Sequence, residues 1–281
     1  RRAPQLTAVI EIPQVLHVEM HCSRVYVPSL LKVTITGNWG NTMTLEFETV
    51  PCLSDNYAYL VHDPDTGATA VVDVPEAQPI LDALKRRGWT LTDVLLTHHH
   101  WDHVDGLAAL LEQAPALVTG AAADAHRLPP LDIAVREGDV VKIGNEAGTV
   151  IDVSGHTVGH IAFHFPASKL AFTADSLMAL GCGRVFEGTM PQMWESLSKL
   201  AALPEDTVIC SGHEYTMANA KFALSIDPDN PRLISRSKAV EQARSKGEPT
   251  VPAVLREELE TNPFLRAGDP GLQAAIGMEG A

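Results

Sequence analysis

A cluster of histidines and one aspartate lies in the middle of the chain. The heptapeptide THHHWDH, at positions 97–103, follows a short apolar run that is typical of a buried strand. Side chains alternate along an extended strand exit, so we expect His98, His100 and Asp102 to point the same way, whereas His103 begins a new turn and faces elsewhere. One segment can then bind two metal ions. A solvated cluster or an affinity tag is the alternative, but tags are uniform and lie at chain ends.

Three further residues of the same chemical types each follow a β-like stretch and a small residue: His156, Asp175 and His213. A single His or Asp at a strand end is more commonly a cap or a satisfied core residue. Their recurrence after three separate strand-like runs favours a shared metal site, because neutral imidazoles and carboxylates are the usual ligands of divalent ions.

Residues around these candidates have their own predictions. Asp73 ends another apolar strand and is a candidate to orient a ligand imidazole, with a turn-forming aspartate as the alternative. His99 lies on the opposite side of the alternation and is the histidine of the run least suited to bind metal. His160 and His164 lie in or beside a strand and could contact a ligand.

On these motifs the chain resembles the metallo-β-lactamase superfamily and, within it, glyoxalase II, the hydroxyacylglutathione hydrolases. The resemblance runs from Met43 to Arg266. The HxHxDH element marks only the superfamily. Glyoxalase II is favoured by the stretches GCGR (181–184), EGT (187–189), GHEYT (212–216) and NPFLR (262–266).

The resemblance implies seven ligands for two divalent ions, with one carboxylate shared. The ligands of the first ion would be His98, His100 and His156. Those of the second would be Asp102, His103 and His213, with Asp175 bridging both. Zinc is the expected metal, and iron and manganese are alternatives because His and Asp ligands accept all three. The resemblance counts Asp102 and Asp175 as catalytic, because a hydroxide shared by the two ions would attack a thioester carbonyl.

The implied reaction is the hydrolysis of S-D-lactoylglutathione to glutathione and D-lactate, which completes methylglyoxal detoxification. Arg184, Tyr215 and Arg266 are the implied contacts to the glutathione portion of this small-molecule partner. The chain has Phe186 where some relatives have a tyrosine, and no further basic residue closely follows Arg266. Both departures would weaken glutathione binding without changing the chemistry.

The implied fold class is α+β: a four-layer αββα metallo-β-lactamase sandwich with a small C-terminal helical domain. We assign residues 43–215 to the catalytic domain and 216–281 to a substrate-binding helical domain. Residues 1–42 hold none of the motifs and are predicted to be an extension outside the family fold. Periodicity predicts a helix over Ala77–Arg87, closed by Gly88, and another that begins after Thr189. No strand is expected after Tyr215.

Composition narrows the class of protein further. The formal net charge of −14 argues against nucleic-acid and anionic-membrane binding, which use basic surfaces. No apolar run reaches the roughly 18 residues that a membrane span needs. The four cysteines fit no disulfide framework or CxxC motif, which favours a cytoplasmic location. We expect a monomer.

Other readings of the same motifs make different predictions. A β-lactamase shares the fold but has little use for the helical C-terminal region. A glutathione persulfide dioxygenase would use one iron, and another thioesterase of this fold would keep both ions. A structural zinc module is disfavoured, because such sites are typically closed and rich in cysteine.

Overall fold

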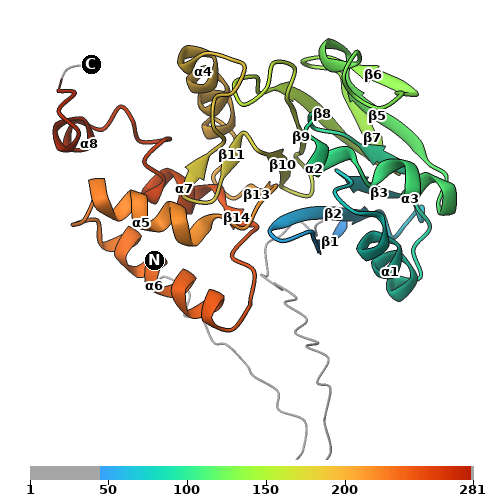
Figure 1. Ribbon diagram of the computed structural model, residues 1–281, viewed down its shortest axis with the longest axis horizontal. Helices are drawn as coiled ribbons and strands as arrows, with labels where there is room; N and C mark the ends of the chain where they lie inside the picture. Colours follow the sequence, from blue (N-terminus) through green and yellow to red (C-terminus); the bar gives the residue numbers. More distant parts are fainter. Residues whose placement is uncertain (1–44, 280–281) are drawn as a thin grey trace, which may run out of the picture. The chain divides into compact units, whose positions relative to one another are not determined.

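Two six-stranded sheets form the framework of the computed structural model, which describes residues 45–279 (Figure 1). The predicted extension, residues 1–42, lies outside the described residues. The first sheet contains, in spatial order, β1 (Glu46–Cys52), β2 (Asn56–His62), β3 (Thr69–Val72), β4 (Asp93–Leu95), β5 (Leu117–Ala121) and β6 (Ile133–Val135). The order in the second sheet is β14 (Ala253–Val254), β13 (Val208–Ser211), β10 (Leu170–Ala174), β9 (Ile161–Phe165), β8 (Glu146–Asp152) and β7 (Val140–Ile143).

The second sheet has two apolar faces, as a central layer must. Along β9, Ile161 and Phe163 join the core between the sheets, whereas Ala162 packs in a separate cluster with α4. The rings of Tyr59 on β2 and Phe172 on β10 lie 5.6 Å apart and join the two sheets. This alternation follows from the period of two along a strand and explains why β9 and β10 carry apolar residues on both faces.

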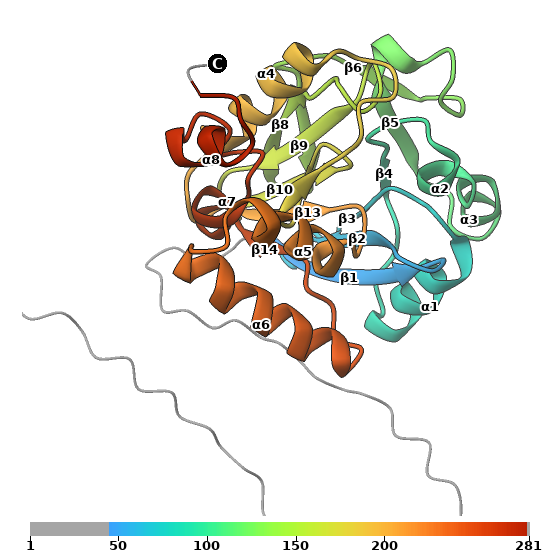
Figure 2. The ribbon, with the colours of Figure 1, turned by 60° about the vertical axis from the view of Figure 1, so that its left-hand side comes forward.

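Helices cover the outer faces of both sheets. The first sheet is covered by α1 (Ala77–Arg87) and α3 (Leu107–Gln113), which follows the one-turn helix α2 (Trp101–Val104). A 3₁₀ turn spans Ala122–Asp124. On the second sheet lies α4 (Met190–Ala201), as Figure 2 shows. The predicted αββα sandwich is therefore confirmed.

Two helix boundaries follow from capping residues that the sequence displays. Gly88 ends α1 with a φ of 70°, a left-handed conformation that favours glycine, and its N–H binds the carbonyl of Lys85. Thr189 caps α4, because its hydroxyl accepts from the Gln192 N–H while the Gln192 side chain accepts from the Thr189 N–H. Both predicted boundaries are confirmed.

The C-terminal segment contains α5 (Thr216–Ile226), α6 (Pro231–Ser245), α7 (Leu255–Thr261) and α8 (Pro270–Ala275). The expectation of no strand after Tyr215 was wrong, because β14 pairs with β13 and widens the second sheet. Two residues are too few to produce a periodic pattern. The buried Asn262 side chain donates to the carbonyls of Met178 and Gly181, in the hairpin formed by β11 (Leu177–Met178) and β12 (Gly181–Cys182). Among residues 45–279 no helix is long and apolar enough to cross a membrane.

Candidate metal centre

The candidate ligands lie just beyond the carboxyl ends of four strands. His98 follows β4, His156 follows β8, Asp175 follows β10 and His213 follows β13. Because β10 and β13 run parallel, their exits bring Asp175 and His213 to the same edge. A hydrogen bond of 3.0 Å from the Ile161 N–H to the Thr97 carbonyl joins the two sheets at this edge. The sandwich therefore gathers residues that are more than 100 positions apart.

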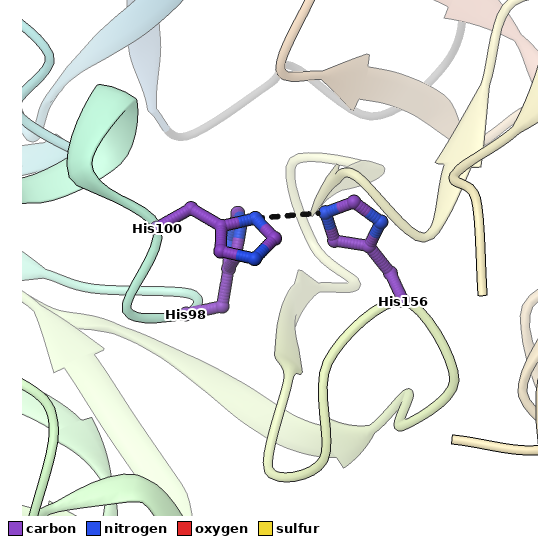
Figure 3. A group of neighbouring side chains, drawn as sticks. All are labelled: His98, His100 and His156. Carbon is purple, nitrogen blue, oxygen red and sulfur yellow. Dashed lines mark hydrogen bonds between the residues drawn. The ribbon is translucent and has the colours of Figure 1, made fainter. Parts of the chain in front are cut away.

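Three imidazoles form the first triad, as Figure 3 shows. The nitrogens offered by His98, His100 and His156 all lie within 4.8 Å of one another. His156 comes from the loop opposite the metal segment, and its Nε2 lies 3.0 Å from the His100 Nδ1. The His98 ring is fully buried, and its Nε2 has no hydrogen-bond partner among the described residues. A buried ring nitrogen without a hydrogen-bond partner, on an imidazole grouped with two others, is the arrangement that a metal ion satisfies.

A second triad consists of Asp102, His103 and His213. The Nε2 atoms of His103 and His213 lie 3.3 Å apart, and the Asp102 Oδ2 lies 3.4 Å from the His213 Nε2. The expectation that Asp102 points with His98 and His100 was wrong. The chain turns into α2 at Trp101, so the alternation of an extended strand ends before Asp102.

Asp175 lies between the triads and contacts both. Its Oδ2 is 3.4 Å from the His156 Nε2 and 3.3 Å from the His213 Nε2, and its Oδ1 is 3.5 Å from the His103 Nε2. The preceding Ala174 has a φ of 41°, and the pairing of β10 with β13 shifts register there. This irregularity turns the carboxylate out of the strand and towards the imidazoles.

Burial and charge act differently on the two triads. Burial lowers the pKa of His98 well below its usual range and also lowers that of His156. Burial acts in the same direction on His103, but Asp175 and Asp73 outweigh it and raise the pKa of that imidazole. The pKa of Asp175 lies well below its usual range, because His103 and His213 outweigh the effect of burial. An ionised carboxylate among converging ring nitrogens fits a divalent cation.

Asp73 anchors both ends of the metal segment. Its Oδ2 lies 2.8 Å from the His103 Nδ1 and accepts from the Thr97 hydroxyl, while its Oδ1 accepts from the Thr97 N–H at 2.9 Å. The predicted contact with the imidazole of a candidate ligand is confirmed, because that imidazole is His103. Holding Nδ1 in this way directs the His103 Nε2 towards Asp175 and His213.

Sequence reasoning missed two neighbouring residues that hold the second triad. The Asp55 Oδ1 lies 3.0 Å from the His213 Nδ1, and the Asn56 side chain donates to the Asp102 carbonyl at 2.9 Å. Both lie in the stretch PCLSDNY, at positions 51–57, for which the sequence predicted no role. An aspartate and an asparagine in a turn are ordinary turn formers, so sequence alone gives no signal for this contact.

The other histidines of the region lie outside the two triads. The His99 Nδ1 lies 2.8 Å from the buried Asp124 Oδ2, so the prediction that it faces away from the ligands is confirmed. His160 stacks on His98 with ring centroids 4.6 Å apart, and burial lowers its pKa to about 3. His160 therefore supports the His98 ring as a neutral flat surface.

The predicted substrate contacts occupy different surroundings. Tyr215 stacks on His213 with ring centroids 4.7 Å apart, and the exposed Phe186 ring lies 5.3 Å from that of His156. Arg184 is exposed, and its carbonyl lies 2.7 Å from the His156 Nδ1. The Arg266 guanidinium, in contrast, is paired with Asp227 and Asp269. Arg266 is thus already engaged by two carboxylates.

Comparison with known proteins decides the family. A sequence model of the metallo-beta-lactamase superfamily matches residues 54–213, and one of the hydroxyacylglutathione hydrolase C-terminus matches residues 214–281. A protein of Ruegeria pomeroyi named hydroxyacylglutathione hydrolase is 67% identical over 239 residues, which cover 85% of this chain and 94% of the relative. The chain belongs to the hydroxyacylglutathione hydrolase family. Members from Cereibacter sphaeroides and Rhodobacter capsulatus share 66% and 56% identity with it over similar spans.

Solved structures extend the family likeness to the fold. ETHE1 from Myxococcus xanthus superposes with a TM-score of 0.55 at 27% identity, covering 79% of this chain and 99% of that one. TTHA1623 in a di-iron-bound form gives a TM-score of 0.51 at 28% identity over 59% of this chain and 90% of its own. The B3 metallo-beta-lactamase BLEG-1 gives 0.61 at 20% identity, covering 78% of this chain and 99% of its own, which shows the fold alone. Family and donor set together indicate that this hydrolase-family chain binds divalent metal.

Proposed function

We propose that the protein hydrolyses S-D-lactoylglutathione to glutathione and D-lactate. The observation that carries this proposal is the pair of ligand triads joined by Asp175, in a chain whose curated relatives are named hydroxyacylglutathione hydrolase. In this reaction water adds to the thioester carbonyl carbon and the carbon–sulfur bond breaks. The sulfur leaves as the thiolate of glutathione, and the acyl group becomes D-lactate.

We propose that the centre holds two divalent ions, zinc before iron or manganese. His98, His100 and His156 would hold one ion, and Asp102, His103 and His213 the other. Ions in these positions would lower the pKa of bound water towards neutrality and polarise the carbonyl oxygen. The Asp175 carboxylate would hold the spacing between the two sites, because it already contacts imidazoles of both triads.

Protein side chains would bind and orient the rest of the substrate. Tyr215 and Phe186 flank the two triads, so an acyl thioester placed between them would lie against the ligand imidazoles. Arg184 is exposed and available to bind a carboxylate of the glutathione portion. Arg266 would serve the same portion only by exchanging Asp227 or Asp269 for the substrate carboxylate.

A thioester hydrolysis assay with metal analysis tests the proposal. We expect turnover of S-D-lactoylglutathione by the wild-type chain with two metal ions per chain. Asp175→Ala should lose both metal and activity, whereas Asp206→Ala, which removes a half-buried ion-pair partner of Lys169, should lose neither. Unimpaired turnover by Asp175→Ala would contradict the bridging role. One iron per chain with oxygen consumption would instead indicate a persulfide dioxygenase.

We further propose that the protein is a cytoplasmic monomer with two domains. Three cysteines, Cys52, Cys182 and Cys210, are free thiols, which supports a cytoplasmic location. We propose a monomer, which gel filtration would test. We also propose that residues 43–215 form the catalytic domain and 216–281 the substrate-binding domain, which is supported by the boundary between the two family models at residues 213 and 214.

A further inference from the structure

A group of polar and charged side chains links three loops beside the first triad. We call Arg127, Asp124, Glu187 and His99 the Arg127 cluster. Arg127 follows the 3₁₀ turn, and its three donor nitrogens each bind a different acceptor. Its Nε donates to the Asp124 Oδ1 at 2.6 Å, and its Nη1 donates to the Glu187 Oε1 at 2.6 Å. Its Nη2 donates to the Val158 carbonyl at 2.7 Å.

Each bond of the cluster reaches a segment that carries a candidate site residue. Asp124 binds His99, which lies between the ligands His98 and His100. Val158 lies two residues after the ligand His156, and its N–H donates to the Glu187 Oε2 at 2.8 Å. The cluster therefore joins the metal segment to the loop that follows β8.

Glu187 connects the third loop to the cluster, and the same loop contains Arg184 and Phe186. This loop also binds the β8 loop through its backbone, because the Phe186 N–H donates to the His156 carbonyl and the Gly188 N–H to the Gly155 carbonyl, each at 3.2 Å. Glu187 adds side-chain hydrogen bonds to these backbone bonds, since its carboxylate accepts from Arg127 and from the Val158 N–H and lies 3.5 Å from the His99 Nε2.

The cluster is held together by the charge and the planar geometry of the Arg127 guanidinium. Arg127 lowers the pKa of Glu187 although burial opposes this, so the carboxylate is ionised near neutral pH. Asp124 is fully buried, and a buried carboxylate needs its cationic and hydrogen-bonding partners. A guanidinium spans three acceptors in a planar fork, which the ammonium of a lysine cannot do.

We infer that Arg127 is a positioning residue, which holds the spacing of His98, His100 and His156 and the orientation of the Arg184 loop. It touches no candidate ligand, so its effect passes through His99, Val158 and Glu187. The consequence for substrate rests on the proposed function, whereas the consequence for metal binding does not. Arg127→Lys should weaken zinc binding about tenfold, at the low end of the effect of outer partners on metal sites.

The test compares Arg127→Lys with Arg87→Lys. Arg87 also pairs with a carboxylate, Glu48, but joins α1 to β1 on another part of the protein. Zinc transfer from each folded variant to a chromogenic chelator gives the affinity, and S-D-lactoylglutathione turnover gives kcat and KM. We expect weaker zinc binding and a raised KM only in Arg127→Lys. Glu187→Gln, which keeps an acceptor for the Val158 N–H, should lose less than Glu187→Ala.

The inference is overturned if Arg127→Lys binds zinc as tightly as the wild type, or if Arg87→Lys loses as much zinc affinity as Arg127→Lys. Equal behaviour of Glu187→Gln and Glu187→Ala would also contradict it. Should Arg127→Lys fail to fold, the two Glu187 variants decide the question. If the wild type hydrolyses no thioester, the proposed function fails while zinc transfer still tests the positioning role.

Discussion

Replacing Asp73 by asparagine removes one charge from the support of the second triad and keeps the shape of the side chain. The two carboxylate oxygens accept three hydrogen bonds, from the Thr97 N–H, the Thr97 hydroxyl and the His103 Nδ1. An asparagine has only one acceptor oxygen. If its NH₂ group faces Thr97 N–H, that buried donor loses its partner. If the NH₂ group faces His103 instead, two donors meet and the imidazole proton moves to Nε2, where the metal would bind.

The two orientations of the asparagine amide set the expected losses of stability and of metal affinity. One buried donor without a partner costs about 1–3 kcal/mol of stability. Loss of the carboxylate behind a ligand imidazole typically lowers metal affinity by about 10–100-fold. We therefore expect Asp73→Asn to unfold at a lower temperature, to release zinc to a chelator more readily, and to lose kcat for thioester hydrolysis.

Asp63→Asn is the matched control for this experiment. Asp63 is also buried and accepts from the N–H groups of Asp65, Thr66 and Asn145. Its loss should lower stability by a similar amount without weakening zinc binding. The reasoning about Asp73 is refuted if Asp73→Asn and Asp63→Asn lose equal stability and both keep the zinc affinity and kcat of the wild type.

Two further substitutions test other parts of the structure. Gly183→Ala would place a Cβ 1.9 Å from the Asp175 carbonyl and 2.9 Å from the His156 Nδ1, so it should cost about 1–3 kcal/mol and lower metal content. Gly268→Ala, where nothing lies within 4 Å, should leave thermal unfolding and metal content unchanged, and equal effects of both would contradict the crowding argument. The backbone N–H of Asn145 and other donors lower the pKa of Asp63 below its ordinary value of 3.8, so its ionised form stabilises the fold above that pH. The deficit of Asp63→Asn in urea unfolding should therefore be full at neutral pH and shrink as the pH falls below 3.8; a deficit independent of pH would refute this.

Four of the candidate ligands were predictable because each follows a strand that the sequence displays. The apolar run before His98 and the runs before His156, Asp175 and His213 give the same local signal, and the structure brings all four together. The position of Asp102 was not predictable in this way. A helical turn begins at Trp101, and no periodic pattern in so short a segment announces it.

Contacts between residues that are far apart in the chain could not be predicted from the sequence. Asp55 reaches His213 across 158 positions and Arg127 reaches Glu187 across 60, and each residue looks locally like an ordinary turn or surface residue. The strand β14 exists only because β13 offers it an edge. All three features, the two contacts and strand β14, depend on tertiary pairing. Local propensity does not encode such pairing.

The candidate ligands are divided between the two sheets, and this division links metal uptake to folding. His98, His100, Asp102 and His103 follow a strand of the first sheet, whereas His156, Asp175 and His213 follow strands of the second. Each of the two triads takes members from both sides. Metal bound in either of the two triads would therefore link the two halves, so metal binding and the packing of one sheet on the other should be coupled. Removing bound metal should weaken the packing between the two sheets before it weakens the hydrogen bonding within either sheet.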